Sequence, residues 1–141
     1  MKILGFFQQV LFEKKLIKKH KKILALQDAS YRRFKLCLKE RDWCGCAADI
    51  RFILEGIVSI ESSMAVENPL GTSSQLNSFS DEAYSTSSAI IDDISASLKK
   101  EEALRLEFSR QIMNETSGWK DRMVHRLTMF DPELKALLTI K

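Results

Sequence analysis

Apolar residues recur along the first forty residues at seven-residue spacing, the pattern of one face of a long α-helix. Six consecutive positions of this series are apolar or aromatic: Ile3, Val10, Ile17, Leu24, Tyr31 and Leu38. A companion series is less regular, because His20 and Gln27 stand between Phe6 and Phe34. The pattern predicts an amphipathic helix over about residues 3–41 with a wide apolar face, about 55 Å long at ~1.5 Å per residue.

A second apolar series predicts a helix over about residues 43–67 that faces the core. Asp42 is a suitable N-cap, and the seven-residue spacing then resumes with Trp43, Ile50, Ile57 and Met64. The segment ends at Asn68-Pro69-Leu70-Gly71, where Pro and Gly together favour a turn.

Serine and threonine dominate the next segment. Between Gly71 and Ser88, nine of eighteen residues are Ser or Thr, which favour loops and helix caps. We expect a connection over about 68–80, interpreted as a flexible linker, with a phosphorylated switch as the alternative. Later apolar spacing predicts one helix over about 81–115 and short helices over about 119–130 and 133–140.

These elements predict a single all-α domain over residues 1–141. The expected architecture is an antiparallel bundle or hairpin of three long amphipathic helices with a short C-terminal helical tail. The composition agrees, because 45% hydrophobic and 29% charged residues are typical of a folded globular chain. No apolar run approaches the ~18 residues of a membrane span, and the apolar N-terminal stretch is interpreted as mature protein and not as a signal peptide.

The residues that could carry chemistry form no catalytic or metal-binding pattern. Cys37, Cys44 and Cys46 are an odd, crowded set, which favours a reducing compartment and buried thiols that pack as small hydrophobes. His20 and His125 are isolated and are interpreted as surface or seam histidines. Without a nucleophile, phosphate-binding or zinc motif, we expect no enzymatic activity, no cofactor and no metal.

Charge is distributed unevenly along the chain. Residues 1–41 hold twelve Lys or Arg against three acids, for +9, and residues 42–141 hold ten against sixteen, for −6. The lysines of residues 14–22 either pair with the acidic third helix or bind an acidic partner. The candidate partner-binding residues are apolar anchors followed by lysines: Phe6, Phe7, Val10, Leu11, Lys14, Lys15, Lys18 and Lys19.

This pattern leads to a functional hypothesis of assembly. The chain is expected to be a cytoplasmic adaptor, scaffold or chaperone-like subunit that docks onto another helical protein or a second copy of itself. The alternative is a peripheral membrane protein that lays the basic N-terminal helix on anionic lipid. Nucleic acid ranks last as a partner, because the aromatic residues are assigned to the core and leave no stacking platform.

Overall fold

The computed structural model describes residues 2–66, 74–115 and 119–138, with the side chains of residues 2–10, 12–13, 61–66, 74–84 and 119 left out of the description. Over these ranges every regular element is a helix, as the all-α prediction requires. Within the described residues six helices follow one another: α1 (Lys2–Glu40), α2 (Trp43–Val66), α3 (Ser74–Lys100), α4 (Glu102–Met113), α5 (Trp119–Phe130) and α6 (Glu133–Leu137).

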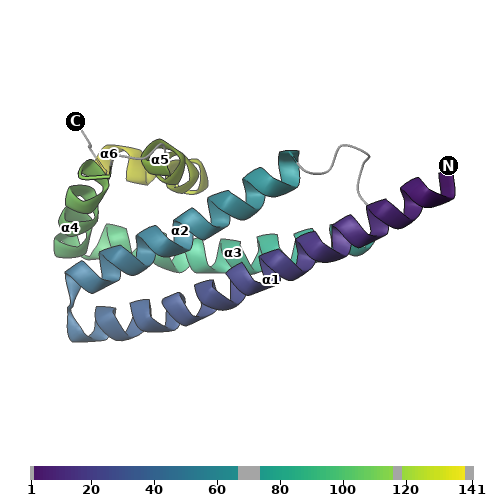
Figure 1. Ribbon diagram of the computed structural model, residues 1–141. Helices are drawn as coiled ribbons and strands as arrows, with labels where there is room; N and C mark the ends of the chain where they lie inside the picture. The colour runs from purple at the N-terminus through teal and green to yellow at the C-terminus, as the bar shows by residue number, and fades with distance from the viewer. Residues whose placement is uncertain (1, 67–73, 116–118, 139–141) are drawn as a thin grey trace.

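Helices α1 and α2 lie side by side and are joined by a tight reversal (Figure 1). Arg41 adopts the left-handed backbone conformation, with φ of 59°, and the amide of Asp42 donates to the carbonyl of Cys37 at 2.8 Å. The Asp42 carboxylate then accepts from the amide of Gly45 at 3.1 Å, so it caps the start of α2 as its position suggests. In Figure 1 the N-terminal turns of α1 extend past the end of α2.

Helix α2 is the centre of the packing. It contacts α1 along one side, and it also packs against α4 and α5. The core draws completely buried or nearly buried side chains from each of the helices: Phe34, Ile50, Leu54, Ile94, Leu98, Phe108, Leu127 and Leu134. Burial of such side chains stabilises the fold by about 1.5–3 kcal/mol each.

The single helix predicted over residues 81–115 is wrong, because the chain bends at Glu101. The backbone there is extended, with φ −106° and ψ 103°, and α4 turns away to pack on α2. The Arg105 guanidinium donates to the carbonyls of Leu98 at 2.9 Å and Lys99 at 3.3 Å, which satisfies acceptors at the end of α3. Lys99 also pairs with Asp131 at 2.7 Å and ties the bend to the C-terminal helices.

The connection predicted over about residues 68–80 ends earlier than expected. Helix α3 already begins at Ser74, so residues 74–80 are helical, while residues 67–73 lie outside the described residues. Serine is less favourable than alanine in a helix by only a few tenths of a kcal/mol, so a run of serines does not by itself prevent helix formation.

The cysteines and His20 differ in part from their predicted environments. Cys46 is buried and Cys37 half-buried, but Cys44 is exposed, so burial of all three thiols is wrong. Cys44 lies in the first turn of α2, where its carbonyl accepts from Gln111 of α4 at 3.1 Å. His20 is a seam residue and is completely buried. Among the described residues, no three His, Cys, Asp or Glu side chains gather closely enough to hold a metal ion.

Candidate functional site

The basic run of α1 forms one exposed face of that helix. Residues Leu16, Ile17 and His20 are buried within the same segment, so the helix has a core side and a charged side. The lysine face consists of the exposed side chains of Lys14, Lys15, Lys18, Lys19, Lys21 and Lys22. Successive helical residues are ~100° apart, so these lysines cover about 160° of the circumference.

The lysine face has no acidic counterpart among the described residues. The described ion pairs of α1 lie further along the helix, where Arg32 pairs with Asp28 and Arg33 with Asp49. In the described part of α3, Asp92 is exposed, while Asp93 accepts a hydrogen bond from Tyr31 and not from a lysine. Internal pairing of the lysines with the third helix is therefore not seen at these positions; the side chains of 81–82 lie outside the described residues.

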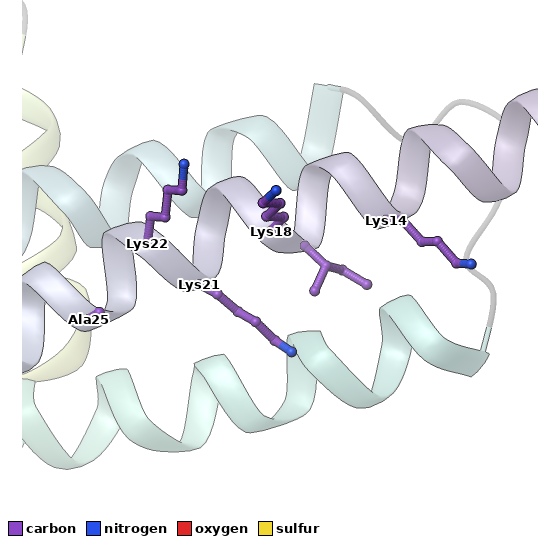
Figure 2. A pocket seen from close by; sticks show the side chains of 6 residues that line it. Lys14, Lys18, Lys21, Lys22 and Ala25 are labelled. Atoms are coloured by element: carbon purple, nitrogen blue, oxygen red, sulfur yellow. The ribbon is translucent and has the colours of Figure 1, made fainter.

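A hollow lies along the lysine face. Its volume is about 480 Å³, and it is lined by Lys14, Ile17, Lys18, Lys21, Lys22 and Ala25. Figure 2 shows Lys18 and Lys22 extending from one side of α1, and Lys14 and Lys21 from the other. The hollow therefore has an apolar floor and ammonium groups at its rim, which suits an anionic group attached to an apolar body.

A second hollow lies where α1 and α2 meet. It has a volume of about 250 Å³ and is lined by Ile23, Leu26, Phe52, Glu55, Gly56 and Ser59. Leu26 is 55% exposed and Phe52 is 45% exposed, so two large apolar side chains at its edges are in contact with solvent. Such exposure next to a charged face is typical of interaction surfaces.

The predicted binding residues fall into two groups in the structure. Lys14, Lys15, Lys18 and Lys19 lie on the exposed face, and Leu11 is 58% exposed at its N-terminal end. The side chains of Phe6, Phe7 and Val10 lie outside the described residues, although their backbone belongs to α1.

Sequence reasoning missed several residues of this surface. Lys21 and Lys22 line the first hollow but were not among the predicted contacts. Leu26 and Phe52, at the second hollow, were not considered either. For the lysines, the spacing from Lys14 to Lys18, Lys21 and Lys22 was a usable signal, because residues three and four apart share a helix face.

Another cluster of charged side chains lies between α2 and α4, where its members contact one another. Arg51 pairs with Glu115 and donates to the side-chain oxygen of Gln111 at 3.4 Å. Hydrogen bonds from Arg110 and Gln111 lower the pKa of Glu107 to about 2, so this carboxylate is ionised and engaged at neutral pH. The contacts of Gln111 with Arg51 and Cys44 hold α4 against α2. The lysine face with its hollow, together with the second hollow between α1 and α2, remains the candidate site.

Over the part of the chain that the structure describes, no helix has an apolar stretch sufficient to cross a membrane. Comparison with known proteins gives no match to any protein-family model, to any curated protein or to any solved structure.

Proposed function

We propose that this protein is a non-enzymatic interaction module that binds an acidic helical protein on the lysine face of α1. The observation that carries the proposal is the set of six exposed lysines within nine residues, for which no acidic side chain among the described residues is a partner. Like charges held on one rigid helix repel each other, and binding of an acidic surface relieves that repulsion while it accelerates association.

A peripheral membrane role is the second candidate, and the exposed Leu11 beside the lysines favours it. An interfacial helix, however, needs an apolar face opposite its basic face to insert between lipids. On α1 that opposite face is already in the core, because Leu16, Ile17 and Phe34 are at most 6% exposed. Lipid could then contact only the lysines and a few leucines, so a protein partner ranks first.

The test is affinity purification of the tagged chain from its own cells, with mass spectrometry of the proteins that co-elute. One variant changes Lys14, Lys15, Lys18 and Lys19 to Glu. A matched control variant makes the same change of net charge at exposed basic residues outside the lysine face: Lys39, Arg41, Lys100 and Lys135. Circular dichroism of both variants checks that the helices are retained.

We expect a stoichiometric acidic partner that the wild-type chain and the control variant retain and the lysine-face variant loses. Retention of the partner by both variants would contradict the proposal. Co-sedimentation with vesicles that contain phosphatidylserine tests the second candidate. Binding that raised salt abolishes would favour lipid, because exposed charges are screened within about 8 Å at physiological ionic strength.

A further inference from the structure

The solvent-facing side of α1 carries a continuous line of exposed residues that extends beyond the lysine face. Their separations are three or four residues, the spacing that aligns side chains along one helix face. We define this outer stripe by its eight members, all of which are exposed: Leu11, Lys15, Lys18, Lys22, Leu26, Ala29, Arg33 and Leu36. The stripe spans about 38 Å at ~1.5 Å per residue.

The chemistry of the outer stripe is apolar at three points and basic between them. Leu11, Leu26 and Leu36 are 58%, 55% and 55% exposed, which is a large apolar area for surface leucines arranged in one line. Three lysines lie between the first two leucines, while Arg33 lies between the second and third and pairs with Asp49 at 2.8 Å. A line of this kind is a coiled-coil-like seam with positive charge at its N-terminal half.

From this line we infer that the outer stripe binds a single acidic amphipathic helix, laid along α1, which places one large apolar side chain in the hollow between α1 and α2. The inference rests on the proposed function and specifies the partner. Leu26 belongs to the outer stripe and also lies at the edge of that hollow, where Phe52 of α2 is its neighbour in the lining. Since a cavity of about 150 Å³ admits a benzene-sized group, the hollow of about 250 Å³ has room for a leucine or phenylalanine side chain.

Charge selects this occupant over a second copy of the chain. If two copies joined in parallel through the outer stripe, the cations of each would face the same cations of the other. In an antiparallel pair Lys15 would face Arg33, while Lys18 and Lys22 would lie opposite Ala29 and Leu26 without an acidic partner. Both arrangements place positive charge in the seam with no opposite charge to pair it, which is destabilising. A helix with Glu or Asp at the corresponding positions would instead pair with the lysines while its apolar residues cover the three leucines. Salt would weaken only the first of these contributions.

The experiment uses the full chain and designed peptides. The probe is an acidic peptide of about 28 residues, long enough to span the stripe at ~1.5 Å per residue, with Leu and Glu in the stripe's spacing and made in both chain directions. The control peptide has the same composition, but its leucines are distributed around the helix. Fluorescence anisotropy measures Kd for the wild type, for Leu26→Ala and for Leu106→Ala, which removes a leucine 63% exposed on α4.

We expect the patterned peptide to bind at least about tenfold more tightly than its control, and Leu26→Ala to remove about that factor while Leu106→Ala does not. Equal, salt-sensitive binding of both peptides would overturn the seam and its hollow but leave the lysine-face proposal standing. A second outcome would also overturn only the seam: no acidic peptide binds the chain, while the affinity purification still shows an acidic partner that the Lys-to-Glu variant loses. A dimer of the chain that Leu26→Ala disperses would replace the acidic helix by a second copy.

Discussion

Replacement of Gly56 by alanine should destabilise the fold, although alanine is the better helix former. An alanine Cβ at this position would lie 2.7 Å from Nε2 and 3.3 Å from Cδ of Gln27. That side chain is 1% exposed and donates from Nε2 to the carbonyl of Ile53 at 2.9 Å, so a movement away from the new Cβ would break or distort this buried hydrogen bond.

The magnitude follows from opposing contributions. Breaking the buried hydrogen bond costs about 1–3 kcal/mol, and overpacking a core contact costs about 1–3 kcal/mol. The higher helix propensity of alanine returns about 1 kcal/mol. We therefore expect Gly56→Ala to lower the free energy of unfolding by about 2 kcal/mol, measured by urea denaturation followed by circular dichroism.

The background variant Gln27→Ala makes this prediction sharp. Once the amide is removed, the clash is gone and Gly56→Ala should become neutral or stabilising by up to about 1 kcal/mol. The double-mutant cycle should accordingly give a coupling free energy of about 2–3 kcal/mol between the two positions. If Gly56→Ala raised stability by the same amount in both backgrounds, close packing of α1 on α2 at this point would be refuted.

Three further predictions concern single side chains. Tyr31→Phe should cost about 1 kcal/mol. The hydrogen bond to Asp93 raises the pKa of Tyr31 to about 12, so the stability that this hydrogen bond contributes should be lost as the pH rises from about 10 to 12. Tyrosinate absorbance should show a titration near pH 12 in the wild type that is absent in the variant. Arg110 helps to lower the pKa of Glu107 to about 2, so the stability that the Glu107 carboxylate contributes is lost as the pH falls from about 4.5 to 2. Glu107→Gln should therefore show a smaller loss of stability over this range, measured as the urea midpoint at each pH. An unchanged pH profile in the variant would contradict this. Arg105→Met should lower the unfolding free energy by about 1 kcal/mol in the same assay, since the carbonyls at the end of α3 lose a donor.

The two longest apolar series could be read from the residues because helical periodicity is a local property. The seven-residue spacing through Ile17 and Leu24 places α1, and Asp42 marks the start of α2 by a cap that depends on neighbours three residues away. The lysines of residues 14–22 could be assigned to a surface for the same reason, since charged side chains at these spacings share the side opposite the apolar series.

The bend at Glu101 could not be placed in this way. Leu98 and Leu104 are both completely buried, and apolar spacing alone allows a continuous helix through them. The bend exists because α4 gains a surface on α2, because Arg105 satisfies a carbonyl that the break exposes, and because Lys99 at the bend pairs with Asp131. One local signal was present, since Lys99 and Lys100 before Glu101 and Glu102 after it match the dipoles of a helix end and a helix start.

The candidate site depends most on long-range packing. Helix α1 carries two sets of apolar residues, one on the wide face that includes Ile17 and Phe34 and another in the line through Leu11, Leu26 and Leu36. The positions of α2 and α3 determine that the first set is covered and the second faces solvent, and the hollow at Leu26 requires residues of both α1 and α2. The physical reason is that burial measures area removed from water by neighbours in space, and residue order along a helix does not specify which neighbours those are.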